Sequence, residues 1–339
     1  MPAVGVGVAG LGVALGEPCS VAETAASYVE DPERVLNWGY HTYHRSPPGQ
    51  SPTRLAARAA TAALADAGVD PSAVDLLVVA NSEVPEFLQW DVSAAVAREV
   101  GTTAPTLLLN QGCASAVTGF QQVAGHFAVR DDVETVLLVA VNQVSEAHSN
   151  RMRLNTCLGS DGASAALLRR GHPRLRWLAT EQITDPAYVD FFRVEYGGSA
   201  VPLPPDGVGN PDVDVLGLVY RHFRRAPAQL AEFATALTGR VVEVVERACR
   251  RVGIDRSEVA RLVYLNDNQA SIAAVAAAVG VPPERTNASL AAATGHCGAA
   301  DHLICLDAFA RHGDLADGDV IALAGVSSGM HWFCTLLVV

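Results

Sequence analysis

Asn110-Gln111-Gly112-Cys113-Ala114-Ser115-Ala116 is the stretch around which the chain is organised. The apolar run Thr106-Leu107-Leu108-Leu109 precedes it and predicts a short buried strand. Residues 114–124 follow it, are mostly small and apolar, and predict a buried helix. Cys113 is therefore expected on a strand-to-helix turn, where unpaired N–H groups and the positive end of the helix dipole favour a thiolate. Because most cysteines are buried and inert, this stretch alone leaves both interpretations open.

The composition of the chain indicates a folded protein with a large core. Of its 339 residues, 50% are hydrophobic and 18% are charged, which argues against intrinsic disorder. The net charge of -12 argues against nucleic acid as a partner. The seven cysteines are scattered and form no CxxC pair, so we expect neither a disulfide framework nor a metal site.

The first residues of the chain predict a glycine-containing strand. Residues 1–15 are apolar, yet no Lys or Arg precedes the apolar run, as a signal peptide would require. The run is also too short for a membrane span, so no membrane partner is expected. Together with the cysteine usage, this favours a cytoplasmic protein.

Two halves of the chain resemble each other at a nearly constant separation. Ala67-Gly68-Val69-Asp70 matches Val252-Gly253-Ile254-Asp255, and each lies between a predicted helix and an apolar strand. Further along, Gly112-Cys113-Ala114 is matched by His296-Cys297-Gly298. Several matches at one separation indicate a duplication.

The alternation of helices and apolar strands predicts α/β units with mainly parallel sheets. With two buried central helices, we expect a layered α/β/α/β/α sandwich of two duplicated halves, residues 1–170 and residues 171–339. Residues 181–225 break the pattern and are rich in Pro and Gly. They are expected to be an insertion that shapes a pocket or its lid.

Turns at equivalent positions converge if the halves face each other about a pseudo-twofold axis. The turn equivalent to that of Cys113 carries His296, and a third turn, residues 266–271, carries Asp267 and Asn268. These two polar residues either cap the following helix or orient His296. A cysteine, a histidine and an acid or amide then form a nucleophile, its base and the orienter of that base. In this hypothesis His296 takes the thiol proton and later deprotonates the acceptor.

Two further features refine this hypothesis. Cys297 competes with Cys113 as nucleophile, but neighbouring residues on a helix point in different directions, so it pairs poorly with His296. We therefore favour Cys113. The last turn, residues 325–330, is either a tight turn or part of an oxyanion hole formed by the backbone N–H groups of Gly329 and Cys113.

The densest basic run in this acidic chain is Arg221-His222-Phe223-Arg224-Arg225. It is either a solvated helix face or a docking site for an anionic partner. In the second interpretation Arg221, Arg224 and Arg225 contact the partner.

In these residues the chain resembles the thiolase superfamily and, within it, the β-ketoacyl-acyl-carrier-protein synthase III group. The resemblance implies that Cys113 is the nucleophile and that an acyl-phosphopantetheine thioester, on acyl carrier protein or coenzyme A, is the substrate, with no permanently bound cofactor. It also implies a homodimer formed through residues 106–109. The motifs that carry the resemblance are Gly112-Cys113-Ala114-Ser115-Ala116, Gly159-Ser160-Asp161-Gly162-Ala163, Asn268-Gln269-Ala270-Ser271, Gly295-His296-Cys297-Gly298 and Ser328-Gly329-Met330-His331-Trp332.

The chain departs from that group at two important positions. The group's His in a His-Gln-Ala-Asn motif is replaced by Asn268, and its Asn on the next turn is replaced by His296. In the group these two side chains stabilise the charge formed when a malonyl group loses carbon dioxide. Without this pair in its usual order, the chain resembles the acyltransferring branch found in polyketide and antibiotic pathways.

The hypothesis is therefore an acyltransferase that moves an acyl group from a carrier protein or coenzyme A to a hydroxyl, an amine or a second carrier. One alternative is a decarboxylating condensing enzyme in which Asn268 and His296 act in exchanged positions. The other alternative is a non-catalytic protein that binds an acyl carrier.

Overall fold

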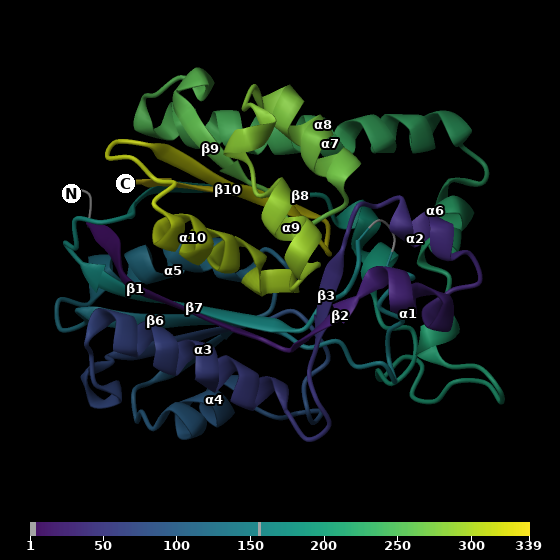
Figure 1. Ribbon diagram of the computed structural model, residues 1–339, viewed down its shortest axis with the longest axis horizontal. Helices are drawn as coiled ribbons and strands as arrows, with labels where there is room; N and C mark the ends of the chain where they lie inside the picture. Colours follow the sequence, from purple (N-terminus) through teal and green to yellow (C-terminus); the bar gives the residue numbers. More distant parts are fainter. Residues whose placement is uncertain (1–4, 155–156) are drawn as a thin grey trace.

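The chain forms two main sheets with two helices, α5 (Ser115–Val129) and α10 (Asp301–His312), buried between them (Figure 1). The computed structural model describes residues 5–154 and 157–339. Helices α3 (Pro52–Ala67) and α4 (Val92–Val100) cover the outside of the first sheet. Helices α7 (Pro227–Val252) and α8 (Gln269–Val279) cover the outside of the second. This confirms the predicted α/β/α/β/α order of layers.

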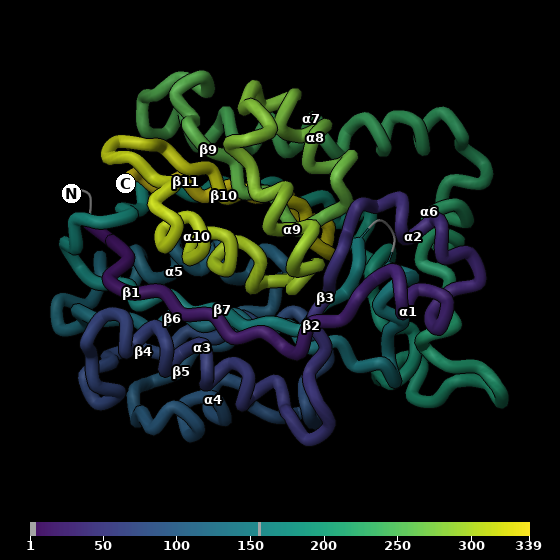
Figure 2. Tube along the Cα trace, in the orientation of Figure 1, coloured from purple at the N-terminus to yellow at the C-terminus, as the bar shows by residue number. Residues whose placement is uncertain are grey.

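The first sheet has the strand order β1-β7-β6-β4-β5. Every residue of β4 and β6 is buried, as expected for strands covered by helices on both faces. Strand β5 lies at the edge and pairs with β4 alone (Figure 2). The strands of this sheet are β1 (Val6–Leu15), β4 (Leu76–Asn81), β5 (Thr106–Leu109), β6 (Thr135–Asn142) and β7 (Gly162–Arg170).

The second sheet repeats the arrangement of the first. Its order β8-β11-β10-β9 places β11, β10 and β9 where the first sheet has β7, β6 and β4. The strands of this sheet are β8 (Arg176–Thr184), β9 (Val259–Val263), β10 (Val320–Ser327) and β11 (His331–Val338).

Both sheets are mixed, whereas the sequence predicted mainly parallel ones. The parallel pairs are β4 with β5, β4 with β6, and β9 with β10. The antiparallel pairs of these two sheets all include β7 or β11, such as β10 with β11. Only three residues separate β10 from β11, and so short a connection joins antiparallel strands.

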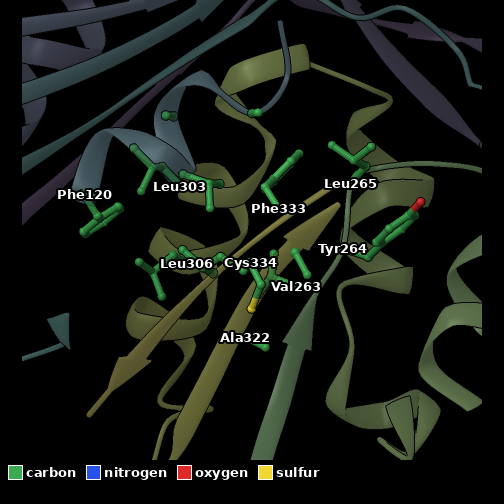
Figure 3. Packing of buried hydrophobic residues seen from close by; sticks show 14 of the residues in the cluster. Phe120, Val263, Tyr264, Leu265, Leu303, Leu306, Ala322, Phe333 and Cys334 are labelled. Carbon is green, nitrogen blue, oxygen red and sulfur yellow. The ribbon is translucent and has the colours of Figure 1, made fainter. Parts of the chain in front are cut away.

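The core between the sheets is built from the apolar faces of the two central helices (Figure 3). Phe120 of α5, Leu306 of α10 and Phe333 of β11 are fully buried in this one core. Burying apolar side chains of this size stabilises the fold by roughly 1.5–3 kcal/mol each. This packing fixes the N-terminal ends of α5 and α10 relative to each other.

A smaller group of elements covers one end of the sandwich. These elements are α1 (Val21–Tyr28), α2 (Pro32–Leu36), the strand pair β2 (Glu17–Ser20) and β3 (Thr42–Arg45), and α6 (Val215–Phe223). Helix α9 (Ala288–Thr294) packs against α8 and β3. No helix in the described part of the chain is long and apolar enough to cross a membrane.

The segment predicted as an insertion begins later than expected, because residues 181–184 complete β8. Between β8 and α6 the chain forms short helical turns at Pro186–Phe192 and Asn210–Asp212, joined by irregular loops. Tyr188, Phe191 and Phe223 pack their rings on Phe233 of α7, with centroid separations of 4.6, 5.5 and 5.4 Å. This aromatic cluster holds the segment against the second half.

Candidate active site

Cys113 lies between β5 and α5, on the predicted strand-to-helix turn. Gly112 has a φ of +56°, and a Cβ there would lie 2.6 Å from the hydroxyl oxygens of Ser327 and Ser328. Glycine therefore permits both the turn and the close approach of the last turn of the chain. The Ser327 hydroxyl donates a hydrogen bond to the carbonyl of Gln111 at 2.7 Å, which ties the two turns together.

His296 follows helix α9 rather than a strand, so the predicted strand-to-helix turn is wrong for this residue. Its N–H donates to the carbonyl of Leu158 at 2.8 Å, and its own carbonyl accepts from the N–H of Ser160 at 2.9 Å. These bonds fix the His296 backbone beside the first half. Its ring then lies with Nε2 3.3 Å from Sγ of Cys113.

The carboxylate that orients His296 belongs to Asp301. Its Oδ2 lies 2.6 Å from Nδ1 of His296. A carboxylate at this distance accepts a hydrogen bond from Nδ1–H, so Nε2 is the nitrogen that exchanges a proton with Cys113. The prediction that Asp267 or Asn268 orients His296 is therefore wrong.

The Asp301 carboxylate is itself held in place by backbone groups. Oδ2 accepts from the N–H of Asn266 at 2.8 Å, and Oδ1 accepts from the N–H of Cys297 at 2.6 Å. Asp301 is fully buried at the start of α10. Buried charge is costly unless it is paired and hydrogen-bonded, and these contacts meet both conditions.

Asn268 and Asp267 lie on the turn that leads into α8. Asn268 is the N-cap residue, and its side chain accepts from the N–H of Ser271 at 2.8 Å. The capping interpretation is thus confirmed for Asn268. Asp267 accepts from the N–H of Asn268 at 2.8 Å and also lines the cavity that contains Cys113.

The electrostatics of the site favour a protonated His296. Burial on its own would lower the pKa of this imidazole, but the charges of Asp301 and Cys113 outweigh it and hold the pKa well above 6.5. Cys297 is different, because it is fully buried and burial raises the pKa of its thiol. The structure therefore favours Cys113 over Cys297 as the nucleophile.

A cavity of about 990 Å³ opens over these groups, and both halves of the chain line it. Cys113, His296 and Asp267 lie on its wall. The segment before and within α6 contributes Phe192 and Tyr220. The volume is that of a pocket for a sizeable ligand. Within the described part of the chain, no group of three His, Cys, Asp or Glu side chains is placed to hold a metal ion.

The remaining predicted residues lie near this cavity or on the adjoining surface. Gly329 has a φ of +128° and lies between Ser328 and Met330, which both line the cavity. Its role in an oxyanion hole with Cys113 remains a prediction. Arg221, Arg224 and Arg225 are exposed at the end of α6.

Two sequence profiles and many relatives match this chain. The profile of 3-oxoacyl-[acyl-carrier-protein (ACP)] synthase III matches residues 109–186, and that of its C-terminal part matches residues 249–339. The β-ketoacyl-[acyl-carrier-protein] synthase III of Gloeobacter violaceus is 30% identical over 286 residues, which cover 84% of this chain and 83% of that protein. The Thermosynechococcus vestitus protein of the same name is 27% identical over 342 residues, 99% of each chain.

Solved structures show the same fold. ChlB3, described as an acyltransferase, matches with a TM-score of 0.85 at 22% identity, over 98% of this chain and 97% of that one. The 3-oxoacyl-(acyl carrier protein) synthase III of Pseudomonas aeruginosa matches with a TM-score of 0.79 at 26% identity, over 98% of both chains. The layers of the fold are those of the thiolase superfamily. Within that superfamily, the chain belongs to the β-ketoacyl-[acyl-carrier-protein] synthase III family of transferases.

Replacing Asp301 by Asn tests the assignment of the orienting carboxylate. Because the amide carries no charge, we expect the pKa of His296, followed by NMR titration of its ring, to fall in Asp301→Asn. We also expect the rate at which an acyl thioester modifies Cys113 to fall by roughly 10²–10⁴-fold, as when the acid of a catalytic triad becomes an amide.

Asp267→Asn is the matched control, since it removes one carboxylate from the same cavity. It should leave the pKa of His296 above 6.5 and change the acylation rate by much less than Asp301→Asn does. A larger loss in Asp267→Asn would restore Asp267 as the orienter and contradict the assignment to Asp301.

Proposed function

We propose that this protein is an acyltransferase that moves an acyl group from a carrier-protein or coenzyme A thioester, through Cys113, to an acceptor without decarboxylation. The observation that carries the proposal is the line of contacts from Cys113 through His296 to Asp301, at 3.3 and 2.6 Å. This arrangement activates a nucleophile and stabilises a charged imidazole, which are the needs of acyl transfer.

In our proposal the thiol proton of Cys113 already lies on Nε2 of His296 in the free protein, and in the first step the resulting thiolate attacks the thioester carbonyl. Asp301 stabilises the imidazolium that forms. In our proposal the backbone N–H groups of Cys113 and Gly329 stabilise the negative oxygen of the tetrahedral intermediate. The intermediate collapses as the bond to the pantetheine sulfur breaks, and that sulfur takes the proton from His296. The product is an acyl thioester on Cys113.

In the second step, an acceptor nucleophile attacks the carbonyl of the acyl group on Cys113. The bond to the Cys113 sulfur breaks, and the sulfur leaves beside His296. Before this step the ring of His296 regains a proton from solvent, and it gives that proton to the Cys113 sulfur, which lies 3.3 Å from Nε2 in the free protein. The proton of the acceptor passes to a base other than this imidazolium.

The polar residues of the third turn argue against decarboxylation. The enolate formed from a malonyl group needs two hydrogen-bond donors, which the resemblance assigns to a His and an Asn. Here the Asn268 side chain caps α8, and the carboxyl group of Asp267 lines the same cavity as Cys113. A carboxylate near the enolate would destabilise it.

Condensation is the second candidate, and the names of the relatives favour it. The Gloeobacter protein and several others carry the name β-ketoacyl-[acyl-carrier-protein] synthase III. The likeness to ChlB3, at 22% identity, shows the fold alone and does not decide between the reactions. The choice for acyl transfer therefore rests on the site residues of this chain.

A homodimer formed through β5 completes the proposal. The outer edge of β5 pairs with no strand of the described chain, and Leu108 on it is 38% exposed. An exposed apolar edge is suited to pair with a second copy of itself. We place this enzyme in the cytoplasm, in a polyketide or other natural-product pathway.

Carboxyl-labelled malonyl-N-acetylcysteamine, supplied with a hydroxyl or amine acceptor, separates the two reactions. We expect no labelled carbon dioxide, because losing one of two enolate donors costs roughly 3 kcal/mol, about a hundredfold in rate. Any malonyl group that is transferred should keep its label. Stoichiometric release of labelled carbon dioxide together with a new β-keto product would instead establish condensation.

The basic run at the end of α6 is proposed to bind the acidic carrier protein. Helix α6 also contributes Tyr220 to the cavity wall, so a carrier docked there lies close to the cavity. The double variant Arg224→Glu plus Arg225→Glu should slow transfer from an acyl carrier protein about tenfold or more at low salt, and the effect should shrink as salt rises. Transfer from a small thioester should not change.

The matched control reverses two exposed arginines on another helix, Arg54→Glu plus Arg58→Glu on α3. It changes the net charge equally, so it reports the effect of overall charge alone. Docking at α6 would be ruled out if the α6 variant slowed transfer from the carrier protein and from the small thioester equally. It would also be ruled out if the two double variants slowed transfer from the carrier protein equally.

A further inference from the structure

Glu83 is a carboxylic acid in the cavity to which the mechanism above gives no role. It follows β4 and lines the same cavity as Cys113 and His296. Its backbone carbonyl accepts from the side-chain amide of Asn81 at 2.6 Å, which fixes the start of this loop. The residue is half-buried on the wall of this cavity.

Arg151 is the buried cation whose charge lowers the pKa of Glu83, but its guanidinium group already forms ion pairs with two other acids. Arg151 pairs with Asp161 at 2.8 Å and with Glu146 at 2.6 Å. No ion pair joins Glu83 to any residue in the described ranges 5–154 and 157–339. A carboxyl group without such a partner is available to exchange a proton with a bound molecule.

The environment of Glu83 makes this exchange possible near neutral pH. The pKa of Glu83 is raised to about 7, mainly because of burial. A hydrogen bond from the backbone N–H of Val84 opposes this rise. The charge of Asp161 raises the pKa further, and those of His296 and Arg151 lower it. The other titratable groups that line the cavity are Cys113, His148, Arg153, Cys157, Arg193, Glu195, Tyr220, Tyr264, Asp267 and His296.

His296 is poorly suited to be the base of the second step. Asp301 remains beside its ring when Cys113 is acylated, and the Asp301 charge is the largest influence that raises the pKa of this imidazole. After giving up a proton to the leaving pantetheine sulfur, the ring regains one from solvent. A protonated ring stabilises the departing Cys113 sulfur but accepts no proton from the acceptor.

We propose that Glu83 is the base that deprotonates the acceptor in the second step, and that the acceptor is an alcohol; this rests on the acyl transfer proposed above. The alcohol gives its proton to the Glu83 carboxylate as its oxygen attacks the carbonyl carbon of acyl-Cys113. The carbon–sulfur bond breaks, and the sulfur leaves with the bonding electrons and takes a proton from His296. Glu83 then releases its proton to solvent, and His296 regains one.

The class of acceptor follows from the chemistry of the two nucleophiles. A thiol ionises enough near neutral pH to attack as its own thiolate, so a carrier thiol needs little help from a base. An alcohol does not ionise there and needs a positioned base, whose optimal pKa lies near the working pH. The carboxyl group of Glu83 meets this requirement, so we expect the acceptor to be an alcohol.

The test compares wild type with Glu83→Gln after both are acetylated by acetyl-N-acetylcysteamine. Intact mass spectrometry first measures the acetylation of Cys113, which should be equal in the two proteins. After the donor is removed, glycerol serves as the alcohol and N-acetylcysteamine as the thiol acceptor. We expect Glu83→Gln to transfer to glycerol about a hundredfold more slowly than wild type, and to the thiol at an unchanged rate.

The pH dependence gives a second readout. The base must be ionised, so transfer to glycerol by wild type should rise with pH through about 7 and then level off. This rise should be missing in Glu83→Gln and partly restored in Glu83→Asp. Glu86→Gln, in the same loop, is the matched control and should behave like wild type.

Two results would overturn the assignment of Glu83 while leaving acyl transfer intact. One is transfer to glycerol at the wild-type rate in Glu83→Gln. The other is equal slowing with both acceptors, which indicates a structural role. If wild type itself accepts no acetyl group, or transfers it to neither acceptor, the proposed function fails and the role of Glu83 fails with it.

Discussion

The buried carboxylate of Asp301 is the constraint on which the site depends. A charged group at the start of an apolar helix between two sheets is destabilising unless several donors surround it. Asp301 receives those donors from three places, the ring of His296 and the backbone N–H groups of Cys297 and Asn266. The same contacts that make this charge tolerable therefore fix the tautomer and the direction of the imidazole.

The duplicated architecture supplies the rest of the geometry. Each half contributes one central helix, and the N-terminal ends of α5 and α10 present Cys113 and Asp301 toward the same region. The apolar packing around Phe120 and Phe333 holds these helices at a fixed separation. The absence of a side chain at Gly112 lets the last turn approach the turn that carries Cys113. The fold thus brings nucleophile and base together from segments far apart in the sequence.

The sequence predicted those parts of the structure that depend on local patterns. The layers, the duplication and the position of Cys113 all follow from apolar periodicity and from the residues of single turns. Asp301 was missed because the orienting group was expected on a third converging turn, whereas it lies five residues beyond His296 on the same segment. The signal available was a lone acid opening an apolar helix, a position where an unpaired carboxylate would be unstable.

Local sequence patterns could predict neither the environment of Glu83 nor the directions of the strands. A single glutamate after a strand has no pattern that distinguishes a cavity wall from a solvent-exposed loop. Its environment depends on Arg151, Asp161 and His296, which only the tertiary fold brings near it. Likewise, β7 and β11 run antiparallel to β6 and β10 because no helix connects the strands of either pair. The pattern of apolar residues within a strand does not indicate its direction.

The claim that Cys113 is the nucleophile activated by His296 and Asp301 is tested most directly by locating the acyl group on the protein. The protein is incubated with an acyl thioester, trapped at low pH, digested and analysed by peptide mass spectrometry. We expect one adduct, on Cys113, which is lost in Cys113→Ala and retained in Cys297→Ala. An adduct on Cys297, or acylation that persists in Cys113→Ala, would contradict it.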